Sequence, residues 1–269
     1  MKHRHKVGIV GGNGWLGSAI GLAMLEAGVI EPRDLCVSSR SGLAPSFADW
    51  PDVEAISDNA VLAQRSDVIV LSVRPQQFPD IGIDAGGKLV VSVMAGVAMK
   101  TLQTRCGSDR VVRAMPNAAA EIRRSYSPWC ASAAVTDSDK TFVQAMFEAS
   151  GTADEVPDEA AIDYLTALSG SGPAFPALLA AAMLEHARRN GLGEAVARRA
   201  VAAVVTDAAQ LMRAASFSPE DMVKTFIDYR GTTAAGLQAM LDHGFKEAVG
   251  AGLGAATEKA AAMAASEAG

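Results

Sequence analysis

The amino-acid sequence predicts two domains, an α/β domain with a doubly wound parallel sheet at residues 1–157 and an all-helical domain at residues 158–269. Three observations lead to this fold class. In the first half, short β-branched runs alternate with helical periods, which is typical of a sheet covered on both faces. Beyond Pro157 no convincing strand remains, and Ala-, Leu- and Met-rich stretches are punctuated by glycine. The length of 269 residues also fits two domains of ordinary size.

The strands of the first domain are expected in short apolar runs with helices between them. The first run, at 7–10, leads directly into a helical period at 15–26. Further runs of the same kind are found at 35–38, 68–72, 89–93 and 110–113. Because these runs are continuously apolar, helices are expected on both sides of the sheet.

Helices account for the second domain. The uncharged stretch at 166–184 has the length of a membrane span, but its glycines and prolines favour a turn followed by a buried helix at 177–190. Further helices are expected at 194–214, after the cap at Ser218, and in the Ala-rich tail at 255–269. Helices this rich in alanine bury little area each, so we expect a homodimer or larger homo-oligomer to complete the core.

The composition excludes several classes of protein. With 49% hydrophobic and 20% charged residues, the chain is neither disordered nor fibrous. The net charge is −6 and the basic residues are scattered, which argues against a nucleic-acid partner. The apolar stretch after the basic start is too short for a signal peptide, and no membrane partner is expected. Three cysteines without CxxC spacing predict no metal site, and they are typical of reduced thiols in the cytoplasm.

A glycine-rich turn joins the first expected strand to the first helix. Gly12, Gly14 and Gly17 satisfy G-x-G-x-x-G, and between a strand and a helix this motif indicates a Rossmann-type dinucleotide-binding fold. Such glycines let the backbone approach a pyrophosphate at the helix N-terminus. The alternative is a glycine-rich turn without a ligand. The residues expected to bind the cofactor here are Gly11, Gly12, Asn13, Gly14, Trp15 and Leu16.

The end of the second strand predicts which dinucleotide is bound. An NAD site needs a carboxylate there for the ribose 2′-hydroxyl, but Asp34 precedes the strand and lies at its wrong end. The strand exit instead carries Ser39 and Arg40 among further serines, a set that suits the 2′-phosphate of NADP. The alternative for Arg40 is a solvated surface side chain. We therefore expect NADP as the cofactor.

Five short sequence motifs are spread along most of the chain. They are LSVRPQ at 71–76, SVMAGV at 92–97, RAMPN at 113–117, ALSGSGPAF at 167–175 and GTTAAGL at 231–237. Together they resemble the motifs of the pyrroline-5-carboxylate reductase family, in that order and at similar spacing. The resemblance implies NADPH-dependent reduction of the C=N bond of a cyclic imine carboxylate, most directly 1-pyrroline-5-carboxylate to proline.

The resemblance also implies roles for residues within these segments. Thr233 is the candidate proton donor to the imine nitrogen, with helix N-capping as its alternative role. Asn117 is expected on the nicotinamide side, with a turn asparagine bonded to its own backbone as the alternative. Further cofactor contacts are expected from Val73, Arg74, Pro75, Ala95 and Gly96. The substrate carboxylate is expected at backbone N–H groups and hydroxyls near helix starts, at Ser171, Gly172, Gly231, Thr232 and Thr233.

The sequence departs from the family pattern at two places that bear on the substrate. Ala-Ala-Ala at 118–120 stands where the family has Thr-Pro-Ala, and Asp-Tyr-Arg at 228–230 stands where it has Ser-Pro-Gly. Two other functions therefore stay open. One is an NADP-linked oxidoreductase of the same scaffold acting on a different imine or ketone, and the other is a non-catalytic nucleotide-binding homologue.

Overall fold

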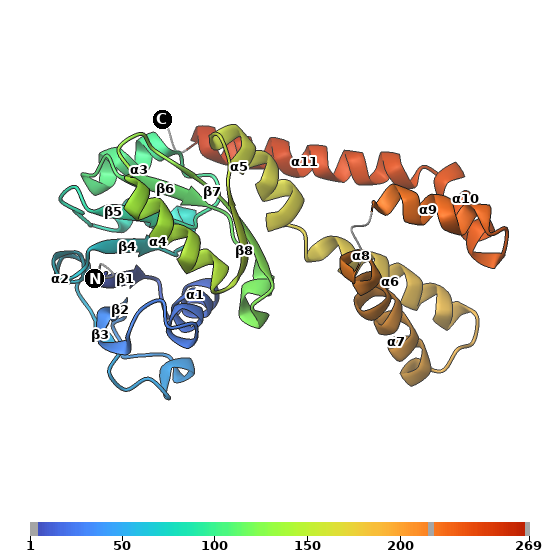
Figure 1. The fold of residues 1–269 in the computed structure, drawn as a ribbon, viewed down its shortest axis with the longest axis horizontal. Coiled ribbons are helices and arrows are strands. Elements are labelled where there is room, and N and C mark those ends of the chain that lie inside the picture. The colour runs from blue at the N-terminus through green and yellow to red at the C-terminus, as the bar shows by residue number, and fades with distance from the viewer. Residues whose placement is uncertain (1–4, 215–217, 267–269) are drawn as a thin grey trace. The chain divides into compact units, whose positions relative to one another are not determined.

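A computed structural model describes residues 5–214 and 218–266 of the chain (Figure 1). The fold divides into two compact units, one formed by residues 1–171 with 256–269 and the other by residues 172–255. The sequence places a domain boundary at Pro157, directly after the last strand, which ends at Glu155.

The first unit is built on one sheet of eight strands in the order β3-β2-β1-β4-β5-β6-β7-β8. Strands β1 to β6 are mutually parallel, whereas β7 pairs antiparallel with β6 and parallel with β8. The predicted α/β class is thus confirmed, and three strands are added that the apolar pattern did not reveal. The strands are β1 (Val7–Val10), β2 (Leu35–Ser38), β3 (Glu54–Ile56), β4 (Val68–Leu71), β5 (Leu89–Ser92), β6 (Val111–Ala114), β7 (Ser125–Ala131) and β8 (Gly151–Glu155).

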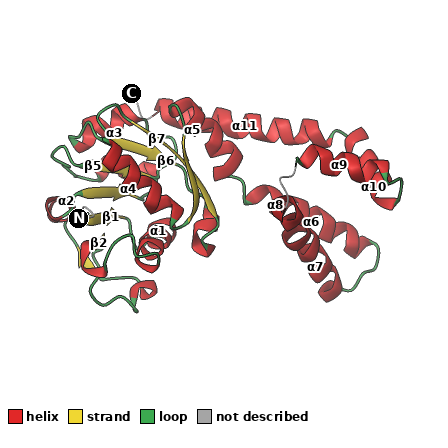
Figure 2. Cartoon of the chain, viewed as in Figure 1, coloured by secondary structure: helices red, strands yellow, loops and turns green. Residues whose placement is uncertain are grey.

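Helices pack on both faces of this sheet, as its continuously apolar strands require (Figure 2). Helices α1 (Trp15–Glu26) and α4 (Asp137–Glu148) contribute to one buried cluster, in which Ile20, Met24 and Phe147 pack against alternate strand residues. Helices α2 (Asn59–Arg65) and α3 (Met99–Cys106) contribute to the cluster on the other face. The sheet therefore has a core on each side.

The strand order reverses direction at β1, which lies between β2 and β4. In open α/β sheets the crevice beyond the carboxyl ends of the strands at such a point is the usual ligand site. The glycine turn leaves β1 at this crevice, and the loops after β2 and β4 begin beside it. The topology therefore brings the three predicted cofactor segments together.

The three cysteines all lie in the first unit. Cys36, Cys106 and Cys130 are free and buried. Burial raises the pKa of Cys106 and of Cys130 to about 11, and it also raises the pKa of Cys36. These side chains pack as small hydrophobes, as the sequence predicts.

In the second unit, residues 172–214 and 218–255 form helices joined by turns and contain no strand. The helices are α6 (Ala174–Arg189), α7 (Glu194–Ala202), α8 (Leu211–Ala214), α9 (Pro219–Asp228), α10 (Thr232–Asp242) and the first part of α11 (Phe245–Ser266). The helix expected without interruption at 194–214 is broken at 203–210 by one π-helical and one 3-10 turn. The expected tail helix at 255–269 is the second half of α11 as far as Ser266.

The expectation of a buried helix at 177–190 is wrong for the single chain. None of the residues of α6 is buried, and Leu178 is 71% exposed. Among the described residues of 172–255, Ala197 and Val201 alone are buried, because paired Ala-rich helices enclose too little volume. One described helical stretch, 159–189, is long and apolar enough to cross a bilayer by length and composition. Core helices of proteins that never enter a membrane pass the same test, so the finding is weak evidence.

Candidate dinucleotide-binding site

The glycine turn after β1 is packed too closely for side chains. Gly11 has φ +80°, and a Cβ atom there would lie 2.3 Å from the Ser72 carbonyl oxygen. A Cβ atom on Gly17, in the first turn of α1, would lie 2.6 Å from the Gly11 carbonyl oxygen. Because both obstacles are backbone atoms, only glycine permits this approach of the helix to the turn.

The N-terminus of α1 is open to an anion. Its N-cap is Gly14, no side chain caps it, and its first turn contains no acidic residue. The N–H groups of a first helical turn have no partner within the helix, and the helix dipole favours negative charge beside them. Trp15 is 57% exposed and donates its Nε1–H to Glu121 Oε2 at 2.9 Å, whereas Leu16 packs against the core. This end of the helix is the structure's best candidate for holding a pyrophosphate.

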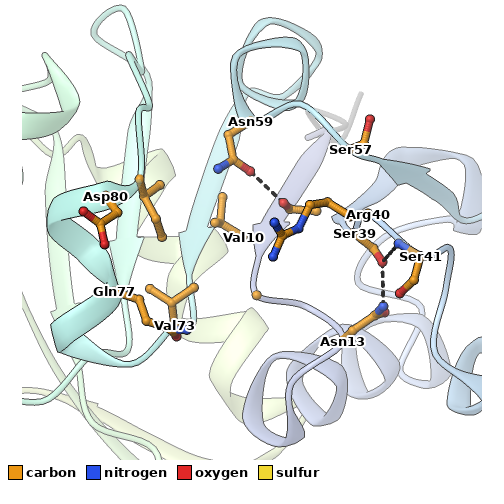
Figure 3. A pocket seen from close by; sticks show the side chains of 13 residues that line it. Val10, Asn13, Ser39, Arg40, Ser41, Ser57, Asn59, Val73, Gln77 and Asp80 are labelled. Carbon is orange, nitrogen blue, oxygen red and sulfur yellow. Dashed lines mark hydrogen bonds between the residues drawn. The ribbon is translucent and has the colours of Figure 1, made fainter.

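A pocket of about 660 Å³ lies beside this turn, at the carboxyl ends of β1 and β2 (Figure 3). It brings together the glycine turn, the exit of β2, the start of α2 and the segment after β4, as the sequence predicts for a dinucleotide site. The lining residues are Val10, Gly11, Asn13, Ser38, Ser39, Arg40, Ser41, Ser57, Asn59, Val73, Gln77, Asp80 and Ile81.

The wall formed by the exit of β2 carries hydroxyls and one cation. Arg40 is exposed, and Ser41 follows it on the same loop. Ser38 donates its hydroxyl to Asn59 Oδ1 at 2.6 Å, which joins β2 to α2. Asp80 is the one carboxylate among the lining residues, and it lies across the pocket from Arg40. Asp34 is buried before β2 begins, at the other end of that strand.

The segment after β4 turns into a short 3-10 helix, η3 (Pro75–Asp80). Val73 lines the pocket, whereas Arg74 and Pro75 are not among its lining residues. Arg74 is the N-cap of η3, and its backbone N–H donates to Gln77 Oε1 at 3.3 Å. The arginine thus lies at the start of η3, beside the pocket.

The predicted nicotinamide-side residues belong to the same unit. Gly96 has φ +69°, so the turn after β5 uses a conformation that favours glycine, and Ala95 packs against a buried cluster around Met115. Asn117 accepts the Ala119 N–H at 3.0 Å, which is the turn role given as its alternative. Its Nδ2 also donates to the Ser169 carbonyl at 3.0 Å, which ties the residues after β6 to the ALSGSGPAF segment.

The N–H of Ser171, expected as a donor to the substrate, is bonded within the chain in this structure. Its N–H donates to the Thr166 carbonyl at 3.0 Å, and its hydroxyl donates to the same oxygen at 3.3 Å. The reason is local, because Thr166–Gly170 forms a π-helical turn that closes on Thr166. Gly172 follows, and its carbonyl accepts the Phe175 N–H at the start of α6.

An ion cluster around the buried Arg113, which sequence reasoning missed, holds this segment to the sheet. Arg113, buried on β6, pairs through Nη1 with Glu159 and through Nη2 with Asp163 at 3.1 Å. Both carboxylates belong to α5 (Glu159–Leu165), which leads directly into the π-helical turn. The partners are about 50 residues away in the chain, so no local pattern could reveal them.

The second unit contains the Gly231-Thr232-Thr233 segment. Gly231 is the N-cap of α10, and no side chain caps this helix, so the N-capping alternative for Thr233 is not observed. Thr232 and Thr233 are both exposed. Arg230 has φ +52°, the left-handed conformation that glycine adopts without strain. The turn therefore keeps a backbone typical of glycine at a position where this chain has arginine.

Comparison with known families divides the chain in a similar way. Residues 6–96 match the family model described as NADP oxidoreductase, coenzyme F420-dependent. Residues 159–263 match the model described as pyrroline-5-carboxylate reductase dimerisation.

Individual relatives extend along almost the whole chain. The pyrroline-5-carboxylate reductase of Pseudomonas aeruginosa is 30% identical over 268 residues, 96% of this chain and 97% of that protein. That of Methanosarcina acetivorans is 31% identical and covers 90% and 92% of the two chains.

Two solved structures superimpose on nearly the whole chain. A pyrroline-5-carboxylate reductase from Coxiella burnetii superimposes with a TM-score of 0.86 at 26% identity, over 97% of this chain and 99% of that one. The Plasmodium falciparum pyrroline carboxylate reductase with NADP bound gives a TM-score of 0.83 at 25% identity, over 98% and 99%. Similarity of this extent confirms the resemblance seen in the motifs, and the chain belongs to the pyrroline-5-carboxylate reductase family.

Proposed function

We propose that this protein reduces the C=N bond of 1-pyrroline-5-carboxylate, with NADPH as the hydride donor and proline as the product. The observation that carries the proposal is the similarity to pyrroline-5-carboxylate reductases along nearly the whole chain, at 30% identity over 96% of its length. The uncapped N-terminus of α1 and the pocket beside it supply the groups that a dinucleotide requires.

The chemistry divides between cofactor and protein. Bound NADPH would supply a hydride to the imine carbon, while the nitrogen takes a proton and becomes the ring amine. The turn at Gly11–Gly14 and the first N–H groups of α1 would hold the pyrophosphate, and Arg40 would hold the 2′-phosphate. Val73, Ala95, Gly96 and Asn117 would border the rest of the dinucleotide.

The substrate is a small carboxylate with one basic nitrogen, and α10 is suited to both groups. The uncapped first turn of α10 favours an anion, and Thr232 and Thr233 add two exposed hydroxyls. We assign the carboxylate to these groups together with Gly172, and the proton at the imine nitrogen to the Thr233 hydroxyl. Because Ser171 donates both its N–H and its hydroxyl to the Thr166 carbonyl, we assign it an indirect role: it shapes the turn that precedes Gly172.

A different imine is the second candidate substrate. Tyr229 and Arg230 replace residues without charge or aromatic ring, and Tyr229 is 84% exposed. A cation and a ring beside α10 could accept a larger anionic imine. A 3-hydroxyacid dehydrogenase on the same scaffold is a weaker alternative. Such an enzyme would carry a catalytic lysine four residues after the Gly-Ser-Gly turn, and this chain has Pro176 at that position.

Steady-state oxidation of NADPH tests the function. With 1-pyrroline-5-carboxylate the purified protein should turn over many times and form proline, whereas open-chain ketones of similar size should react far more slowly. A panel of cyclic imines with larger substituents would identify a different substrate. Binding of NADPH without turnover of any imine would establish the non-catalytic homologue instead.

We also propose that NADP is preferred over NAD. Replacing Arg40 by aspartate removes a charge-assisted hydrogen bond and adds repulsion, so the change should cost about 2–4 kcal/mol of discrimination between NADPH and NADH. The Michaelis constant for NADPH should rise far more than that for NADH. A wild-type protein that uses NADH more efficiently than NADPH would contradict the assignment.

We further propose that two copies of the helical unit pair with each other, alone or within a larger ring. The support is the match to the dimerisation family and the exposed apolar side chains of this unit, among them Leu178, Val196 and Leu211. Light scattering at micromolar concentration should give at least twice the mass of one chain, 27.8 kDa. A stable monomer would contradict the proposal.

The last prediction concerns Thr233. Replacement by alanine removes one hydrogen bond to the reacting nitrogen, so turnover should fall by roughly 10- to 100-fold with the affinity for NADPH nearly unchanged. Serine at the same position keeps the hydroxyl and should restore most of the rate. If alanine instead lowers the melting temperature and leaves turnover intact, the proton comes from water or from the substrate itself.

A further inference from the structure

The loop after β2, residues 39–44, is held by a side chain from a distant part of the chain. Asn13, in the middle of the glycine turn, donates its Nδ2 to Ser39 Oγ at 2.9 Å and to the Gly42 carbonyl at 2.8 Å. Its Oδ1 accepts the Ala44 N–H at 2.9 Å. One amide group therefore bonds the beginning, the tip and the end of this loop. Figure 3 shows the first of these bonds, from Asn13 to Ser39.

The loop's own bonds complete this network. The Ser39 hydroxyl donates to the Gly42 carbonyl and accepts the Ser41 N–H at 3.3 Å. Gly42 has φ +88°, which turns the chain back so that its carbonyl faces Asn13. The hydroxyl proton of Ser39 is therefore committed inside the loop.

The consequence concerns Arg40, whose side chain the network leaves out. Arg40 lies between the bonded residues Ser39 and Ser41, and it lines the pocket. Among the described residues, no hydrogen bond or ion pair of the Arg40 guanidinium is observed, so this cation is available to a ligand. An arginine held on a fixed loop binds a phosphate better than one on a mobile loop, because less conformational entropy is lost on binding.

We propose that Asn13 is a positioning residue that sets the selectivity for NADPH over NADH. It does so by holding the 39–44 loop, which carries Arg40, in one conformation. This inference rests on the proposed function, in which Arg40 reads the 2′-phosphate. It changes the role first expected for Asn13, because both ends of its amide are occupied by the loop and are not free for the pyrophosphate.

The experiment is a double-mutant cycle read out by binding. Calorimetry gives the dissociation constants of NADP⁺ and NAD⁺ for the wild type, Asn13→Ala, Arg40→Met and the double variant. Asn13→Ala should reduce the preference for NADP⁺ by about tenfold through displacement of Arg40, with the affinity for NAD⁺ nearly unchanged. In the Arg40→Met background the same change should have no further effect, because the group that it positions is gone.

Two controls separate positioning from general damage. Asn190→Ala removes an asparagine whose Nδ2 donates to the His186 carbonyl at 2.9 Å, far along the chain from the turn, and should leave the preference unchanged. Hydrogen exchange of the Ala44 amide should be faster in Asn13→Ala than in the wild type or in Asn190→Ala, since only the first change removes the acceptor of that N–H.

Each other outcome has a definite meaning. If Arg40→Met does not alter the preference, the assignment of the 2′-phosphate fails, and the role of Asn13 fails with it. If Arg40→Met reduces the preference but Asn13→Ala does not, or the two effects are additive, only the role of Asn13 is overturned. An equal loss of affinity for both dinucleotides would likewise overturn it, because Asn13 would then support the pyrophosphate turn in general.

Discussion

The close packing of helix α1 on the glycine turn is the constraint on which the nucleotide-binding unit depends. Gly17 and Gly11 approach backbone oxygens at distances that no side chain permits, so the turn and the helix form one rigid element. That rigidity aims the first N–H groups of α1 at a single place beyond β1. It also fixes the backbone position of Asn13, whose side-chain amide then holds the loop after β2 through hydrogen bonds.

The two units of the chain differ in how much apolar surface they bury. The α/β unit encloses a core on each side of its sheet and needs no other surface to bury its strands. The helical unit buries two of its described residues, so it depends on further apolar surface to gain stability. Helix α5 is secured by charge, since the buried Arg113 pairs with two partly exposed carboxylates on this helix. Removing one partner of such a cluster is costly, because a buried charge is left unpaired.

The sequence predicts the parts of the fold that carry a local signal. Strands β1, β2, β4, β5 and β6 are apolar runs, and the glycine turn has a motif that its context supports. Strand β7 contains Pro128 and two serines, and β3 and β8 are short edge strands with acidic residues, so periodicity could not reveal them. The bonds of Asn13 and Arg113 join residues 26 to 50 positions apart, and only the topology brings them together. The π-helical turn that occupies the N–H of Ser171 is local, but π-helical hydrogen bonding has no simple periodic signal in the sequence.

The three buried thiols have a consequence for how the protein meets oxidants. With a pKa of about 11, Cys106 and Cys130 hold roughly one thiolate in ten thousand at neutral pH. The thiolate is the species that attacks peroxides and disulfides, and here it is both scarce and enclosed. We therefore expect these cysteines to stay reduced, and the packing around them to stay intact, under mild oxidation.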